Sequence, residues 1–94
     1  MRLGWEVEKN RINRRKHRVS FETAALVFDD PYHVSLLERE VEGEARWQTI
    51  GMVRGVQVLL VVHLSEFDND EEFIRIISAR KATPQERRIY TAGE

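Results

Sequence analysis

Hydrophobic residues in the first third of the chain have the spacing of helices. In residues 21–28 apolar side chains recur at i, i+3, i+4 and i+7, which places them on one face of an amphipathic helix. Ser20 is a suitable N-cap for this helix, and residues 29–31 (DDP) are expected to end it. Residues 9–17 contain no helix breaker and one apolar side chain, Ile12, so they predict a second, mostly exposed helix.

After Pro31 the hydrophobic pattern changes to the short apolar runs of β-strands. Four such runs are separated by short polar segments: residues 32–40, 47–53, 56–64 and 72–80. Short connections favour antiparallel hairpins, because parallel neighbours need crossovers of about a dozen residues or more. Residues 56–64 are apolar on both faces and are predicted to form the central strand, whereas residues 65–71 (SEFDNDE) are expected to be a polar loop.

Both ends of the chain add an element. Residues 2–7 are expected to start a short strand, and Thr83-Pro84-Gln85-Glu86 is a complete helix start with a capping box. The predicted fold is therefore α+β: two N-terminal helices, an antiparallel sheet of four strands (five if residues 2–7 join it) and one C-terminal helix. At 94 residues, the whole chain (1–94) is expected to form one domain.

The composition limits the cellular compartment and the cofactor chemistry that can be expected. The sequence has no cysteine and begins without an apolar signal region or a membrane-spanning segment, so a soluble, cytoplasmic protein is expected. It has no GxGxxG or Walker loop, and the spacings of its three histidines match no common zinc site, so neither a cofactor nor a metal is expected. Because so small a core is marginally stable, a partner protein is a reasonable expectation.

The charges are sorted along the chain, although the net charge is only −1. Twelve of the 15 basic residues lie in residues 1–18 and 75–94, whereas residues 19–74 hold 12 acidic residues. If folding brings the two ends together, they form a basic surface that attracts phosphate. The alternative is a solvated helix face and a solvated tail.

Cations with a few titratable groups suit metal-independent RNA cleavage. That reaction needs a base for the 2′-hydroxyl, cations for the phosphorane and an acid for the leaving oxygen. Arg80 at the end of the last strand, with Arg87 and Tyr90 in the final helix, can supply cations and a phenol. His63 at the end of the central strand can be the base or acid. The alternatives are a structural His63 and arginines that pair with the acidic middle of the chain.

Strand alternation limits which arginine joins this site. Arg75 and Arg80 are five residues apart, so in a regular strand they face opposite sides of the sheet. Arg80 is nearer the basic last helix and is the predicted site residue.

Several motifs, in this order, resemble the BrnT-type toxin family over nearly the whole chain. They are NRRKHRVSFETAALVFDDP, then an acidic stretch with Glu44 and Arg46, then TIG, LLVVH, IRIISARKA and ERRIY. The resemblance implies a RelE-like fold, ribonuclease activity that inhibits translation, and a ribbon-helix-helix antitoxin that neutralises it. It also implies operator DNA binding only through the antitoxin complex and no membrane association. Arg80, Arg87 and Tyr90 match family positions near the active cleft, while Lys16 and His17 match the basic helix motif and are predicted to bind RNA.

Two positions depart from the family pattern. Arg18 stands where the family usually has a glycine that ends the first helix in a left-handed turn, at a conformational cost if that turn persists. Glu66 lies near the place where the family commonly carries an arginine, and a carboxylate there would repel phosphate.

The alternative function is therefore an inactive toxin-fold protein that acts as an antitoxin-binding module. A third interpretation is a regulatory nucleic-acid binder.

Three aromatic residues are candidate partner contacts. Trp47 and Phe73 alternate into strands and are expected to be core, whereas Phe67, in a polar segment, is expected to be exposed.

Overall fold

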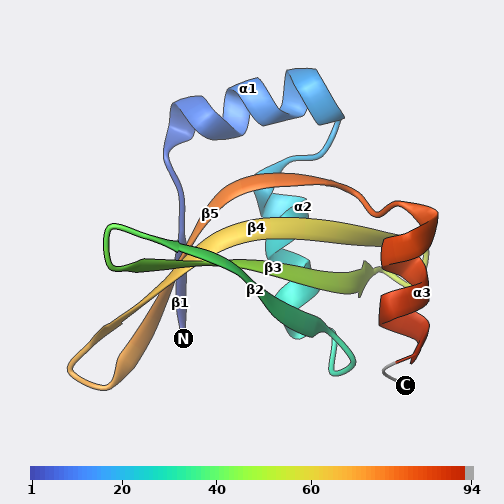
Figure 1. Cartoon of the computed structure of the whole chain (residues 1–94). Coiled ribbons are helices and arrows are strands. Elements are labelled where there is room, and N and C mark those ends of the chain that lie inside the picture. Colours follow the sequence, from blue (N-terminus) through green and yellow to red (C-terminus); the bar gives the residue numbers. More distant parts are fainter. Residues whose placement is uncertain (93–94) are drawn as a thin grey trace.

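The computed structural model describes residues 1–92 and contains one five-stranded sheet with helices on both faces (Figure 1). The elements are, in order, β1 (Arg2–Gly4), α1 (Val7–His17), α2 (Phe21–Ala25), the 3₁₀ helix η1 (Leu26–Asp29), β2 (Val34–Val41), β3 (Glu44–Val53), β4 (Gln57–Asp68), β5 (Glu71–Lys81) and α3 (Pro84–Ala92). The α+β class and the placement of the helices agree with the prediction.

The sheet has the strand order β1-β5-β4-β3-β2. Strands β2 to β5 form the expected antiparallel meander with β4 central, and β1 adds a fifth strand at the far edge. This strand is parallel to β5, with Arg2 opposite Phe73 and Gly4 opposite Arg75, so the sheet is mixed. The pairing places the N-terminal strand beside the beginning of the basic C-terminal segment at Arg75.

The segment predicted as a polar loop, residues 65–71, instead forms the outer ends of β4 and β5. The hairpin turns at Asn69 and Asp70, which both have positive φ (52° and 69°), as a tight hairpin turn requires. The sequence of this segment does not show the apolar pattern of strands, because this end of the hairpin lies outside the buried core. Phe67 is 73% exposed there, which confirms the prediction for that side chain.

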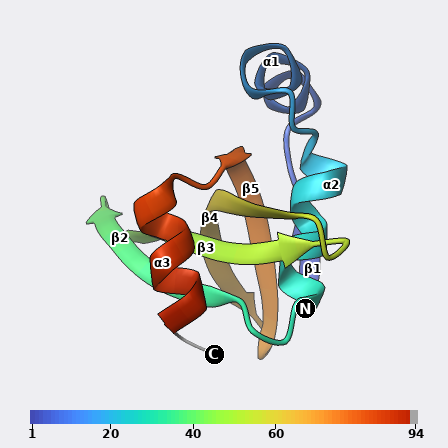
Figure 2. The same cartoon turned by 90° about the vertical axis from the view of Figure 1, so that its right-hand side faces the viewer.

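One face of the sheet, which we call the α2 face, is covered by α2 and η1 (Figure 2). Ser20 caps α2 by accepting a hydrogen bond of 3.0 Å from the Thr23 N–H, as predicted. The helix expected over residues 21–28 is split, because the chain tightens into η1 after Ala25. The main core lies between these helices and the sheet: Phe21, Ala24 and Val27 pack with Leu59, Val61 and Ile76.

The opposite face, which we call the α3 face, is covered by α3 at one end of the strands (Figure 1). Tyr90 packs there on Ile50 and Leu60. The predicted capping box is present, because Thr83 Oγ1 accepts from the Glu86 N–H and Glu86 Oε1 accepts from the Thr83 N–H. Within residues 1–92, no helix covers the rest of the α3 face.

A β-bulge changes which residues of β5 share a face. Opposite β4, Ile76 pairs with His63 and Ser78 with Val62, which leaves Ile77 as an extra residue. The expectation that Arg75 and Arg80 face opposite sides is therefore wrong. They lie opposite Leu64 and Leu60, which are four residues apart on β4, so both arginines belong to the α3 face.

No helix within residues 1–92 is long and apolar enough to cross a membrane.

Candidate functional site

The open half of the α3 face carries a row of cations separated by an apolar residue. Arg46 of β3 and Arg75 of β5 lie opposite Leu64 of β4, one on each side. Two strand spacings separate the arginine backbones by about 10 Å. Arg46 is half buried, and its Nε is buried without a hydrogen-bond partner among the described residues. Guanidinium groups arranged in this way present donors to a phosphate lying across Leu64.

Arg80 lies on the same face, next to α3, and is paired with Glu86. Its Nη1 and Nη2 donate to the two carboxylate oxygens at 2.7 and 2.9 Å. The hydrogen bond from Arg80 lowers the pKa of Glu86, and the same bond raises the pKa of Arg80. Glu86 thus both closes the capping box of α3 and compensates the Arg80 charge.

Tyr90 joins α3 to the segment that follows η1. The ring is 5% exposed, and the hydroxyl donates to Asp30 Oδ2 at 2.7 Å. The same oxygen accepts from the Met52 N–H at 2.7 Å, and Oδ1 accepts from the Tyr32 N–H at 3.0 Å. Burial alone would raise the pKa of Asp30, but the hydrogen bonds from Tyr90 and the two N–H groups outweigh it and lower the pKa. Asp30 therefore holds Tyr90 as a charged acceptor.

His63 lies on the α2 face and is 4% exposed. Its Nε2 shares a 2.7 Å hydrogen bond with Thr49 Oγ1, and the ring of Phe28 meets it edge to face at 5.0 Å. Burial lowers its pKa, which favours the neutral imidazole. The structure therefore brings Arg80 and Tyr90 to one face of the sheet and places His63 on the other.

The three residues predicted to bind RNA fall on two elements. Lys16 and His17 form the last turn of α1, where Lys16 is exposed and His17 is half buried. Arg87 lies on α3 and donates from Nη1 to the Ala82 carbonyl at 3.1 Å. Since α1 lies along the edge of β5 and α3 on the α3 face, Lys16 and His17 are on a different side of the molecule from Arg87 (Figure 2).

Sequence reasoning assigned no site role to two cations of the α3 face, Arg46 and Arg75. Arg46 has the same strand parity as Ile50, which contacts α3, so the alternation in β3 contained a usable signal. Arg75 had no such signal, because the extra residue at Ile77 reverses the parity between Arg75 and Arg80. Among residues 1–92 no group of three histidine, aspartate or glutamate side chains is placed to hold a metal ion.

Comparisons with known proteins agree with this architecture. Residues 5–86 match the family model described as "Ribonuclease toxin, BrnT, of type II toxin-antitoxin system". The fold is similar to the 1.1 Å crystal structure of the Brucella abortus ribonuclease toxin BrnT, with a TM-score of 0.60 and 20% identity, covering 88% of this chain and 97% of that one. A search of curated protein sequences gives no significant match. Because the family model spans most of its length, the chain belongs to the BrnT family of ribonuclease toxins of type II toxin–antitoxin systems.

Proposed function

We propose that this toxin is a metal-independent endoribonuclease that cleaves RNA on the open half of the α3 face and so inhibits translation. The observation that carries the proposal is the row Arg46, Leu64 and Arg75, in which two cations flank an apolar floor. Cleavage by the RNA's own 2′-hydroxyl needs fixed positive charge where the phosphorane develops. Two guanidinium groups on rigid strands provide that charge with little reorganisation.

The face also holds candidates for the remaining roles. Arg80 keeps its predicted role as a cation, acting at the α3 end when its bond to Glu86 opens. Glu66 is two residues along β4 from Leu64, on the same face, and is proposed as the base that removes the 2′-hydroxyl proton. Catalytic roles for His63 and Tyr90 stay predictions. His63 would act from the α2 face, and Tyr90 positions α3 through Asp30.

The test is cleavage of RNA by the purified toxin in the presence of EDTA. Removing one transition-state donor typically costs about 10²–10³-fold in rate. The rate of RNA cleavage is therefore expected to fall by that factor in Arg46→Gln and in Arg75→Gln. Arg88→Gln is the matched control, because it removes an exposed cation of α3 outside the row. His63→Gln tests the opposite face. Full activity in both row variants, or loss of activity in EDTA, overturns the proposal.

The antitoxin is proposed to be a ribbon-helix-helix protein that neutralises the toxin and carries the operator-binding activity of the complex. The supporting observation is membership in a family of type II toxins. Expression of the toxin alone is expected to arrest growth with loss of RNA, and co-expression of a ribbon-helix-helix protein from the neighbouring gene is expected to restore growth. Operator binding by the toxin without that protein would contradict this assignment, as would a failure to restore growth.

A second candidate function is an inactive toxin-fold protein that binds the antitoxin. Two observations favour it: Glu86 compensates the Arg80 charge in a bidentate pair, and Glu66 places a negative charge on the proposed cleavage face. This candidate predicts antitoxin binding by a folded protein that neither arrests growth nor cuts RNA. Glu86→Gln distinguishes the two, because freeing Arg80 is expected to raise cleavage only if the face is catalytic.

A further inference from the structure

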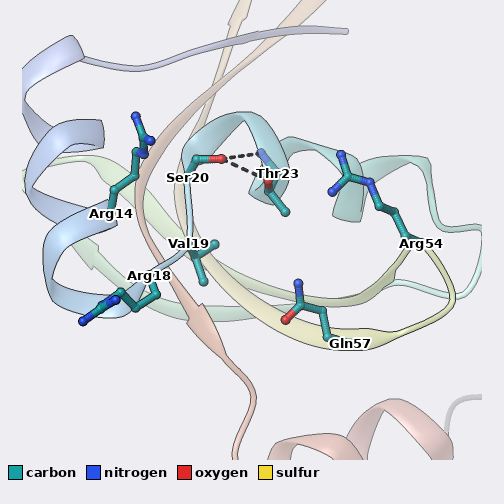
Figure 3. Close-up of a pocket in the computed structure, with 7 residues that line it drawn as sticks. All are labelled: Arg14, Arg18, Val19, Ser20, Thr23, Arg54 and Gln57. Atoms are coloured by element: carbon teal, nitrogen blue, oxygen red, sulfur yellow. Dashed lines mark hydrogen bonds between the residues drawn. The ribbon is translucent and has the colours of Figure 1, made fainter.

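On the α2 side of the molecule, the end of α1, the start of α2 and the β3–β4 turn enclose a hollow of about 420 Å³. Figure 3 shows its lining: Arg14, Arg18, Val19, Ser20, Thr23, Arg54 and Gln57. The Arg54 side chain extends toward the Ser20–Thr23 turn, whereas Arg14 and Arg18 lie on the α1 side of that turn and the Arg18 side chain points away from it. Three cations, two from the end of α1 and one from the β3–β4 turn, therefore border one polar hollow.

The guanidinium groups of this cluster make no ion pair among the described residues. In the part of the chain that the structure describes, residues 1–92, no carboxylate lies within ion-pair distance of the guanidinium groups of Arg14, Arg18 or Arg54. Glu22 accepts a 2.8 Å hydrogen bond from Asn10. The pKa of Glu22 is lowered chiefly by that bond and only secondarily by the charge of Arg14. The hollow is thus a locally positive site that is open to an anion.

The backbone at two of these arginines is in a conformation that disfavours any residue with a Cβ. Arg18 has φ 62° at the end of α1, and Arg54 has φ 55° in the turn with Gly55. An L-residue in the left-handed region costs roughly 1–2 kcal/mol, and glycine is the default residue there. Both positions nevertheless carry long cations, and both border the same hollow. Both arginines therefore keep a positive charge at the hollow although their backbone conformation is unfavourable.

The extended shape of the positive surface favours a polymeric anion over a single small anion as its ligand. A second hollow of about 510 Å³ is lined by Arg11, Arg14, Arg15 and Arg18. It shares Arg14 and Arg18 with the first and adds Arg15, whereas Arg11 is paired with Glu8, so positive charge continues along the last turns of α1. Guanidinium groups bind phosphate oxygens in bidentate pairs, and a continuous series of such groups suits consecutive phosphates of a nucleic acid backbone.

We propose that Arg14, Arg18 and Arg54 form a phosphate-binding site that holds the RNA backbone away from the cleavage face, with the Gln57 amide as a further donor. The identity of the phosphate source rests on the proposed function, whereas the existence of the site does not. The site lies on the α2 side and the cleavage face lies across the sheet, so this site anchors a flanking stretch of RNA rather than the bond that is cut.

The test is binding of a single-stranded 2′-O-methyl oligoribonucleotide, which lacks the free 2′-hydroxyl and stays uncut, measured by fluorescence anisotropy over a series of salt concentrations. The double variant Arg18→Gly/Arg54→Gly removes two cations at positions where glycine fits the backbone, so the fold is retained. The slope of log K against log salt is expected to fall by about 0.7 for each lost phosphate contact. Lys9→Gln, exposed on α1 outside both hollows, is the matched control with unchanged slope.

An unchanged affinity and slope in a folded double variant overturns the inference. A second experiment measures the binding of inorganic phosphate alone. If phosphate binds at the hollow and the oligonucleotide does not, the bound phosphate does not belong to RNA. Because the probe cannot be cleaved, failure of the toxin to cut RNA refutes the proposed function without affecting this result. Weaker binding by the double variant supports the site whether or not the toxin is a nuclease.

Discussion

The side chain of Asn13 pairs with the backbone of Ala79 as a neighbouring strand would. Asn13 Nδ2 donates to the Ala79 carbonyl at 2.8 Å, and Oδ1 accepts from the Ala79 N–H at 3.2 Å. The same Nδ2 donates to the Val19 carbonyl at 2.8 Å. Strand β1 ends opposite Arg75, so Asn13 satisfies the edge of β5 beyond it and fixes α1 against the sheet.

Asn13→Ala is expected to destabilise the fold by about 2–3 kcal/mol, because it leaves buried backbone groups of β5 and of the α1–α2 link without partners. Asn13 is 6% exposed, so water does not readily replace the amide. Urea denaturation followed by circular dichroism measures the loss. Arg15→Ala, on the exposed side of the same helix, is the control and is expected to stay within about 0.5 kcal/mol of the parent. A similar small change for Asn13→Ala would show that the amide pairing contributes little.

Local sequence patterns predicted the elements but not the contacts that depend on the whole chain. The helix over residues 9–17 and the central strand followed from hydrophobic spacing and from the absence of breakers. Nothing local indicates that residues 2–4 pair with β5, because that contact joins the two ends of the chain. Because β4 is apolar on both faces, the sequence also does not tell which face α2 covers, and hence on which side His63 lies.

The sequence predicted the placement of some residues of the candidate site but not of others. Arg80 and Tyr90 were expected together because Arg80 ends the last strand and Tyr90 lies in the helix that follows it, and the structure places them on the same face. Arg75 was assigned to the wrong face, since a bulge adds a residue without changing the composition of the strand. The bulge in β5 and the two apolar faces of β4 are therefore what separated the predicted site from the observed one.

Arg18→Gly is expected to raise the free energy of unfolding by about 1 kcal/mol. Arg18 adopts φ 62° where it ends α1, and its N–H donates to the Arg14 carbonyl at 3.0 Å. Glycine keeps that bond and removes the cost of a Cβ in the left-handed region, although it also adds freedom to the unfolded chain. Thermal unfolding by calorimetry measures the gain.

Arg18→Ala separates strain from charge. It removes the same cation but keeps the Cβ in the left-handed conformation, so no comparable stabilisation is expected. If the alanine variant gains as much stability as the glycine variant, repulsion among the arginines of α1, and not backbone strain, is the cause.

His63 is expected to make the fold less stable in weak acid. Burial, the largest cause, lowers the folded-state pKa of His63 below the usual value of 6.5. The unfolded chain therefore binds a proton at a higher pH than the folded one. Stability is full above about pH 6.5 and falls as the pH drops toward the folded-state pKa, by up to about 1.4 kcal/mol per pH unit.

The measurement is a set of denaturant titrations between pH 7.5 and pH 5. His63→Gln keeps a group that can hydrogen bond to Thr49 but cannot gain a proton, so its stability is expected to change less over this range. Parallel curves for the two proteins would show that another group is responsible for the acid sensitivity.

Tyr90→Phe is expected to destabilise the fold by about 1–2 kcal/mol at neutral pH, because it removes a hydrogen bond from a phenol to a charged carboxylate. The pKa of Asp30 is lowered in the folded state, as hydrogen bonds from Tyr90 and two N–H groups outweigh its burial. Asp30 therefore contributes stability above its unfolded pKa of about 3.8, and this contribution is lost as the pH falls through the folded-state pKa. The difference between the parent and Tyr90→Phe should accordingly shrink below about pH 3.8.

A double-mutant cycle with Asp30→Asn isolates this pair. The coupling energy between Asp30 and Tyr90 at pH 7 is expected to be positive and to decline in acid, because the protonated carboxyl accepts the phenol bond less strongly. NMR titration of the Asp30 carboxyl in Tyr90→Phe should show its pKa moving up toward the ordinary value. If the pKa does not move, the two N–H groups of Met52 and Tyr32 suffice to hold the charge, and Tyr90 anchors α3 through its packing on Leu60 instead.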